Sequence, residues 1–315
     1  MKHLLRITLL NLLLLPAALA LGTPVGWQPL LEPQELAVIL ADASEVRIIR
    51  VSGNYARGHL PGSVESVYEQ WRGTGRNPGE LRELEEYTAL LQGLGIDAET
   101  PVAVVHEGSN PADMGAATRV YWTLKSLGVN DVAVVNGGFR AWQAAGLAVS
   151  TDPVTVTPSD YSPSWRSDWR VTTEEVEVLV QTGEANLVDA RPVSFYRGLR
   201  ATLGEPGTIR GAANLQYETW FDGDRLTTRR ALAESLQSLA LDAPITVSFC
   251  NTGHWASINW FVMSELLGVK NTRLYAESVA AWSEEERPMD NQVGRLRVYR
   301  DLTYRWLQDL LGNQP

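Results

Sequence analysis

The residue with the clearest chemical capacity is Cys250, the only cysteine among 315 residues. It follows an apolar, β-branched run at residues 245–249 and precedes a segment typical of the start of a helix. A loop between a strand and a helix can turn backbone N–H groups toward one sulfur atom, and the helix N-terminus adds a positive dipole. Both effects favour a thiolate. The position predicts a nucleophilic cysteine, with an inert, buried side chain as the alternative.

The segments around this thiol belong to a repeat. "AATRVYWTLKSLGVNDVAVVNGGFRAW" (116–142) aligns with "ASINWFVMSELLGVKNTRLYAESVAAW" (256–282) at a constant offset of 140. Upstream, "GHLPGS" (58–63) faces "GTIRGA" (207–212), and "RIIRVS" (47–52) faces "NLVDAR" (186–191). Because the blocks recur in the same order, we infer a duplicated domain.

Each half contains the same series of strands and helices. Strands are predicted at residues 46–49, 102–106 and 132–136, and again at 187–189, 245–249 and 272–276. Continuous apolar strands that alternate with helices indicate an α/β fold, here two tandem domains, each a mainly parallel sheet with helices on both faces. Such sheets bind ligands at the carboxyl ends of their strands, which is where Cys250 stands.

The N-terminus has the pattern of a secretory signal peptide. A short basic start precedes an apolar run at residues 7–15, and Ala18-Leu19-Ala20 is typical of a cleavage site after Ala20. The run is short for a membrane span. We therefore predict a signal peptide at 1–20, export to the periplasm, and no membrane association after cleavage.

The remaining chain divides into four further segments. We predict a first domain at 21–150, a linker at 151–169, a second domain at 170–285 and a C-terminal helical extension at 286–315. The linker is rich in Ser, Thr, Pro and Asp. Its Trp165 and Trp169 indicate that it packs over a surface.

Charge and cysteine usage exclude several classes of function. The chain has 27 basic and 37 acidic residues, a formal net charge of −10, and loss of the signal with Lys2 and Arg6 would make it −12. An acidic protein without a basic stripe is a poor candidate for binding nucleic acid. One cysteine cannot build a cysteine-rich zinc site, and the four histidines lack metal-ligand spacing. We expect no metal and no cofactor.

These blocks together carry a resemblance to a known family. The chain resembles the tandem-domain rhodanese family, the thiosulfate and 3-mercaptopyruvate sulfurtransferases, over almost all of the predicted mature length. "NGGFRAW" (136–142), "GHLPGS", "LVDAR" (187–191) and "TIRGAAN" (208–214) are similar to its landmarks, and "CNTGHWA" (250–256) to its active-site loop. The first half has "VVHEGSNPADMGAA" (104–117) at the matching place, without cysteine. The resemblance thus implies that the first domain is non-catalytic and the second domain is catalytic.

The resemblance implies a two-step sulfur transfer. The Cys250 thiolate would attack the outer sulfur of thiosulfate and expel sulfite, and the Cys250 persulfide would pass its sulfur to cyanide or a thiol. Cationic groups would hold the anionic part of the donor, with Arg191 as the first candidate and Arg197 as the second. The loop residues expected to hold the terminal sulfur are Asn251, Thr252, Gly253, His254, Trp255, Ala256 and Ser257.

The loop also departs from the family pattern. Thiosulfate-type relatives usually carry basic residues directly after the cysteine and mercaptopyruvate-type relatives carry small ones, whereas Asn251 and Thr252 are neither. Phe195 stands where many relatives have an arginine. Thiosulfate is the favoured donor and 3-mercaptopyruvate the alternative.

Two alternative functions of the second domain were also considered. Phosphatases that share this fold use a longer loop that ends in an arginine, and no arginine follows Cys250 in the loop. A non-enzymatic module that carries sulfur or binds a partner is favoured by the missing basic residues and opposed by the intact loop.

Overall fold

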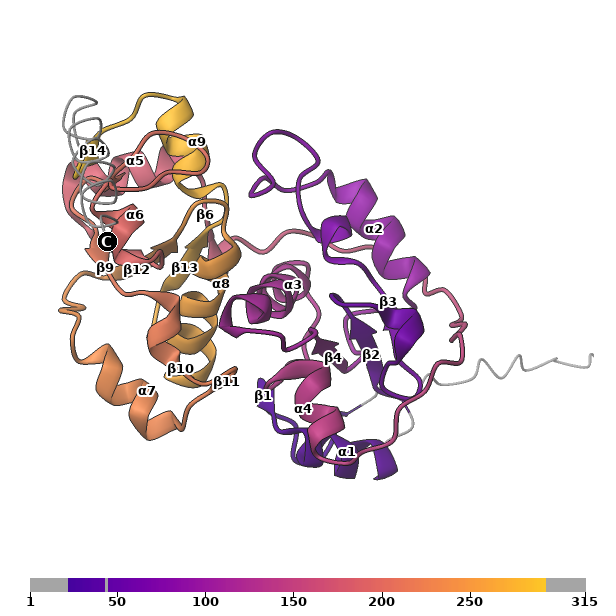
Figure 1. Cartoon of the computed structure of the whole chain (residues 1–315). Coiled ribbons are helices and arrows are strands. Elements are labelled where there is room, and N and C mark those ends of the chain that lie inside the picture. Colours follow the sequence, from indigo (N-terminus) through magenta and orange to yellow (C-terminus); the bar gives the residue numbers. More distant parts are fainter. Residues whose placement is uncertain (1–21, 43–44, 293–315) are drawn as a thin grey trace, which may run out of the picture.

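The computed structural model describes residues 22–42 and 45–292. The predicted signal peptide lies outside the described residues, and so does the predicted C-terminal extension from residue 293 onward. Figure 1 shows two domains joined by an extended segment. Each domain is built on one five-stranded sheet.

The first domain has a parallel sheet in the order β1-β5-β4-β2-β3. Its strands are β1 (Leu30–Leu31), β2 (Arg47–Arg50), β3 (Val64–Glu65), β4 (Val102–Val105) and β5 (Val132–Val135). Its helices are α1 (Pro33–Asp42), α2 (Leu84–Gly93), α3 (Met114–Ser126) and α4 (Gly138–Ala144), with the 3₁₀ turns η1 (Tyr55–Arg57), η2 (Tyr68–Trp71) and η3 (Pro111–Asp113).

The second domain has a parallel sheet in the order β6-β13-β12-β7-β9. Its strands are β6 (Arg170–Val171), β7 (Ala185–Asp189), β9 (Ala213–Asn214), β12 (Ile245–Phe249) and β13 (Thr272–Tyr275). Its helices are α5 (Thr173–Thr182), α6 (Val193–Tyr196), α7 (Arg229–Leu236), α8 (His254–Phe261) and α9 (Ser278–Glu284), and α8 continues as a π-helical turn, η6 (Val262–Leu266). Short elements complete it: η4 (Ser167–Trp169), η5 (Tyr217–Trp220), and the antiparallel pairs β10 (Phe221–Asp222) with β11 (Arg225–Leu226) and β8 (Thr208–Ile209) with β14 (Met289–Asp290).

Helices cover both faces of each sheet, as the apolar strands predicted. In β4, Val102 and Val104 face one core with α3, whereas Ala103 and Val105 face the other core with α1 and α4. This alternation follows from the two-residue period of a strand. The six strands predicted from the sequence are all present, within two residues at each end. The two-residue edge strands β1, β3, β6 and β9 are too short to leave a periodic pattern and were not predicted from the sequence.

The boundary between the domains is packed like a core. One cluster of buried apolar side chains includes Val120 of α3 and Ile258 of α8, and the two helices lie against each other at the centre of Figure 1. The Thr118 and Ser257 hydroxyl oxygens are 2.8 Å apart across this contact. Both domains therefore contribute to the environment of the loop before α8.

The segment between the domains packs on the first domain, as its tryptophans indicated. The Trp165 ring meets Tyr87 edge to face with a centroid distance of 5.4 Å. The Trp122 indole donates a hydrogen bond of 2.9 Å to the Trp169 carbonyl. The linker thereby fixes where β6, which starts at Arg170, joins the second sheet.

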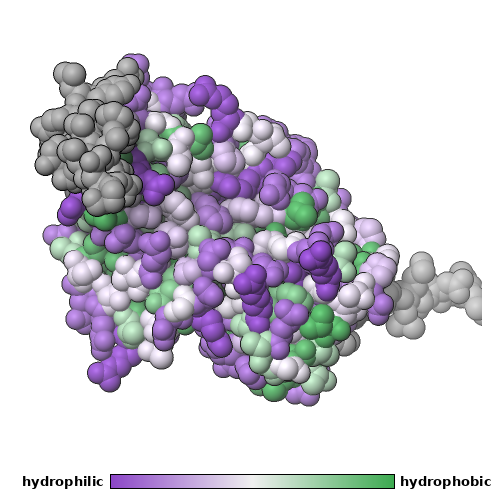
Figure 2. All heavy atoms as spheres, viewed as in Figure 1, coloured by the Kyte–Doolittle hydropathy of each residue, from purple (hydrophilic) through white to green (hydrophobic). Residues whose placement is uncertain are grey.

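Hydrophilic side chains cover much of the face seen in Figure 2, and apolar ones gather mainly over the edge of the first domain that holds α1 and α4. Within residues 22–42 and 45–292, the helices are all too short or too polar to cross a membrane.

Candidate active site

Cys250 is the first residue after β12, at the carboxyl edge of the second sheet. Phe249 pairs with Asp189 in parallel register, so the loops after β12 and β7 leave the sheet side by side. Cys250 is 1 % exposed, and Asn251 and Thr252 are 8 % and 9 % exposed. The loop of residues 250–253 connects this strand end to α8 within four residues.

Gly253 makes the tight connection to α8 possible. Its φ of +72° lies in the left-handed region, which is unfavourable for residues with a Cβ atom. A Cβ atom at this position would also overlap the Arg119 guanidinium and the Ala276 carbonyl oxygen. Glycine is therefore required here for both backbone conformation and space.

Ser278 holds the loop from the neighbouring strand end. Its hydroxyl oxygen accepts hydrogen bonds of 3.1 Å from the Cys250 and Gly253 amides and donates one of 2.7 Å to the Tyr275 carbonyl. Ser278 has a φ of +56°, which is rare for a residue other than glycine. Ser278 was not among the residues predicted from the sequence. Its alignment with Gly138 in the repeat could have indicated its special backbone conformation.

These bonds leave the rest of the loop amides free for an anion. Among the residues that the structure describes, the amides of five loop and helix-start residues donate to no protein acceptor: Asn251, Thr252, His254, Trp255 and Ala256. The α8 N-terminus carries the positive end of the helix dipole at the same place. The loop can thus stabilise a negatively charged sulfur.

Arg191 lies beneath this loop in a closed network. Its guanidinium is 1 % exposed and forms a two-point ion pair with Asp189, with contacts of 2.7–3.1 Å. It also donates to the Gly207 carbonyl at 2.6 Å and to Asn251 Oδ1 at 3.2 Å. Arg191, the first candidate from the sequence for binding the donor anion, therefore has its donors bonded to protein acceptors. Through these bonds it connects the loop to the sheet.

The remaining predicted residues lie on different sides of the loop. Arg197 is exposed at the end of α6. Trp255 stacks on Tyr217 with a centroid distance of 5.1 Å and meets Phe195 edge to face at 6.0 Å. Ala256 and Ser257 are fully buried in α8. Trp255 forms an aromatic wall next to the loop, whereas the last two side chains belong to the helix packing.

His254 is a neutral link between the domains. Burial, with a smaller effect from Arg72, lowers its pKa to about 4. Its Nε2 lies 2.8 Å from the Ala112 carbonyl oxygen, which can only accept, so Nε2 carries the proton and Nδ1 accepts from the Tyr68 hydroxyl at 2.9 Å. His254 therefore brings no charge to the loop at pH 7.

The first domain covers the loop from above with residues 72–79. Arg72 donates to the Thr252 carbonyl and hydroxyl oxygens at 2.9 and 2.8 Å. The Asn77 amide donates to the Glu277 carbonyl at 2.9 Å, and Gly79 packs against the Thr252 backbone. None of these residues was predicted from the sequence. Contacts of such long range leave no local signal in the sequence.

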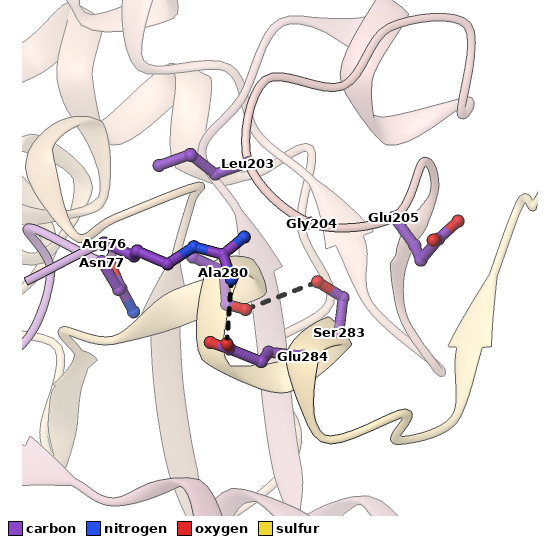
Figure 3. Close-up of a pocket in the computed structure, with 8 residues that line it drawn as sticks. All are labelled: Arg76, Asn77, Leu203, Gly204, Glu205, Ala280, Ser283 and Glu284. Atoms are coloured by element: carbon purple, nitrogen blue, oxygen red, sulfur yellow. Dashed lines mark hydrogen bonds and ion pairs between the residues drawn. The ribbon is translucent and has the colours of Figure 1, made fainter.

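A cavity of about 210 Å³ lies beside this cover, between the two domains. Figure 3 shows Arg76 of the first domain reaching toward Glu284 of α9, with an ion pair of 3.8 Å, across from the loop at Leu203. Ala280, which lines the cavity, donates its amide to the Asn251 carbonyl of the active-site loop.

The first domain has an equivalent loop with different chemistry. His106 follows β4 as Cys250 follows β12, and its carbonyl accepts from the Phe139 amide as that of Cys250 accepts from Val279. Both ring nitrogens of His106 are buried without a partner among the described residues, and burial lowers its pKa to about 4. The loop amides of Gly108 and Ser109 donate to Asp113 instead of remaining free.

Metal ligation has no support in the described part of the chain. Within it, no three His, Cys, Asp or Glu side chains gather closely enough to hold an ion.

The chain belongs to the rhodanese-like domain family, whose model matches residues 33–145 and 172–285. It is 27 % identical over 269 residues to a putative thiosulfate sulfurtransferase of Synechococcus elongatus, covering 80 % of this chain and 82 % of that protein. It is 28 % identical over 246 residues to the 3-mercaptopyruvate sulfurtransferase of Escherichia coli K12, covering 74 % and 82 %. The fold matches the crystal structure of SseA from Escherichia coli with a TM-score of 0.70 at 21 % identity, covering 80 % of this chain and 98 % of that one. The class supported is a sulfurtransferase.

Proposed function

We propose that this chain is a thiosulfate sulfurtransferase that works through a persulfide on Cys250. The observation that carries the proposal is the set of five loop amides without a protein acceptor around the single thiol. An anion at this place would receive their hydrogen bonds and the dipole of α8. The equivalent amides of the first domain, by contrast, already have an acceptor in Asp113.

The proposed reaction has two displacements. The Cys250 thiolate attacks the outer sulfur of thiosulfate; a new S–S bond forms, the S–S bond of thiosulfate breaks, and sulfite leaves with the electron pair. An acceptor thiolate or cyanide then attacks the outer sulfur of the persulfide, and the Cys250 thiolate leaves. No electrons are gained or lost overall, so neither step needs a redox partner.

The arginines divide into two proposed roles. Arg197 is exposed and bonds to no acceptor among the described residues, so we assign it to the sulfonate of the donor. Arg191 is assigned to holding the loop, since Asp189, Gly207 and Asn251 use its donors.

A second donor, 3-mercaptopyruvate, is favoured by two observations. Asn251 and Thr252 bring no charge to the loop, and the relative from Escherichia coli carries that donor in its name. In this case the C–S bond of the donor breaks, and the pyruvate fragment takes up a proton. The Cys250 persulfide is the same intermediate for both donors.

Export and a carrier role remain further proposals. The N-terminal pattern supports cleavage after Ala20 and a periplasmic location. The N-terminal residue of protein recovered from the periplasm tests this, and Leu21 is the expected one. A sulfur carrier without turnover would form the persulfide but would not pass sulfur to cyanide.

The experiment is mass spectrometry of the protein after incubation with thiosulfate or with 3-mercaptopyruvate. We expect a gain of one sulfur atom, release of sulfite from thiosulfate, and formation of thiocyanate when cyanide follows. Cys250→Ser is the control and should gain nothing. Absence of the persulfide with both donors would overturn the proposal.

A further inference from the structure

Arg119 of the first domain is a fully buried cation without an anionic partner. It is 0 % exposed in the middle of α3. One nitrogen, Nη2, donates to the Gly79 carbonyl at 2.8 Å, but Nε and Nη1 have no acceptor among the described residues. A buried charge is costly when it is unpaired, and arginine stays protonated at any ordinary pH. An anion nearby would therefore stabilise the buried guanidinium.

The unpartnered nitrogen points at the active-site loop. Arg119 Nη1 is the atom that a Cβ atom on Gly253 would meet first, so it lies directly against the turn that follows Cys250. The same guanidinium holds Gly79, which packs on Thr252. Arg119 therefore contacts the loop on one side and its cover on the other.

From this geometry we propose that Arg119 supplies, across the domain boundary, the positive charge that stabilises the sulfur anion of Cys250 during sulfur transfer. Arg119 is a positioning and electrostatic residue, not one that touches the donor. The inference rests on the proposed function for its place in the reaction. It gives the first domain a defined part in the chemistry of the second.

Among the charged groups around the loop, Arg191 is neutralised by Asp189. Arg72 donates through Nη2 to the Thr252 carbonyl and hydroxyl oxygens and has no carboxylate partner in the described chain, so it is a second cation beside Arg119. His254 is neutral at pH 7 because burial lowers its pKa to about 4.

The further titratable groups that act electrostatically on Arg119 include Tyr68, Tyr87 and Glu277. Glu277 is ion-paired with Arg170 at 2.7 Å, and in the described chain no carboxylate lies within 4.0 Å of the Arg119 guanidinium. Burial raises the pKa of Tyr68, while Arg72 and Arg119 oppose the rise and Cys250 adds to it. The Tyr68 hydroxyl thus lies in the field of both the cation and the sulfur.

A purely structural role is the competing explanation. The Arg119 guanidinium also lies over the Trp122 ring at 5.1 Å, and its bond to Gly79 helps to hold residues 72–79. Loss of these contacts would lower stability without changing the ionisation of the thiol.

The test compares Arg119→Gln, which can keep a bond to Gly79, with Arg119→Met, which cannot. Arg50→Gln is the matched control, because Arg50 is 2 % exposed, stands at the end of β2 and contacts Glu107 in the loop of the first domain. The measured quantity is the rate of iodoacetamide alkylation of the single thiol from pH 5 to 10. The rate of sulfur uptake from thiosulfate and the urea midpoint are measured on the same proteins.

We expect both Arg119 variants to shift the alkylation profile to higher pH by about one unit, with roughly 10-fold slower alkylation at pH 7. Arg50→Gln should leave the profile in place even if it lowers the urea midpoint. If Arg119→Met fails to fold, Arg119→Gln carries the test. A profile that is unchanged in Arg119→Gln, or shifted equally in Arg50→Gln, overturns the inference.

Sulfur uptake measured on the same variants separates this role of Arg119 from the proposed function. If the profile shifts as expected but neither donor yields a persulfide, the proposed function fails and the role of Arg119 stands. If sulfur transfer occurs but Arg119→Gln leaves the alkylation profile unchanged, the role of Arg119 fails and the proposed function stands.

Discussion

The loops after β4 and β12 leave corresponding sheets at the same edge, but their amides have different acceptors. In the first domain, Asp113 accepts from the Gly108 and Ser109 amides and from the Ser52 hydroxyl. In the second, Ser278 takes only the amides of Cys250 and Gly253. The first loop therefore binds its own carboxylate, and the second keeps donors for another anion.

Both loops nevertheless have a buried arginine with similar contacts, although the two come from different positions of the repeat: Arg191 is opposite Ser52, two residues after Arg50. Arg50 donates to the Gly58 carbonyl, and Arg191 donates to Gly207, which is the equivalent glycine of the repeat. Each also contacts the side chain that follows the His106 or Cys250 position, which is Glu107 or Asn251. These arginines support the loop in both domains, so their presence does not distinguish a catalytic loop from an inactive one.

The largest effect that tests this comparison is loss of the thiol. Cys250→Ser should reduce sulfur transfer on the order of 10³-fold or more, because the nucleophile is gone. The double variant His106→Cys with Cys250→Ser should remain inactive, since the first loop has Asp113 on its amides. Sulfur uptake by this double variant, measured by mass, would show that the two loops are interchangeable.

The next effect is on the turn at Gly253. Gly253→Ala should abolish sulfur uptake and destabilise the protein by about 1–3 kcal/mol more than Gly211→Ala. Gly211 is the matched control because its φ is +80° and a Cβ atom there would meet nothing within 4 Å. Both variants carry the backbone strain, but only the first overlaps Arg119 and Ala276. Equal urea midpoints for the two would contradict this account.

A smaller effect is expected at Ser278. Ser278→Ala leaves two buried amides without their acceptor, at a cost of about 1–3 kcal/mol in the free energy of unfolding, and loosens the loop. Ser283→Ala in the same helix is the control, since its hydroxyl donates only to carbonyls of that helix. Chemical denaturation and the rate of sulfur uptake should both separate the two variants. If the two variants behave alike, Ser278 does not support the active-site loop.

A further effect concerns pH and both loops together. His106 and His254 have pKa values of about 4 in the folded protein and about 6.5 when unfolded, so the unfolded chain binds more protons between these values. Stability should therefore fall as the pH falls from 6.5 to 4. His254→Gln and His106→Gln should each flatten this fall by roughly one proton, as measured by urea midpoints. A slope that neither variant changes would mean that the two rings are not buried in the neutral form.

The sequence predicted the parts of the site that are local in the chain, but not the contacts made by residues far away in the chain. The strands, the repeat and the position of Cys250 follow from apolar runs and spacing, and the structure has those elements. Asp189 ends β7 and Arg191 lies beyond the strand, so strand periodicity did not predict their ion pair. Arg119 lies 131 positions before Cys250, and no local pattern shows that it reaches the loop.

The contact between α3 and α8 has a further consequence. Tyr121 and Phe261 are the same position of the two repeats, and their rings meet edge to face at 4.9 Å. A residue that contacts its own counterpart is what a two-fold axis produces in a homodimer. Two identical subunits would have to carry the same residue at both loops. Here the two halves are encoded separately, so one can keep the nucleophile while the other presents Arg72 and Arg119 to it.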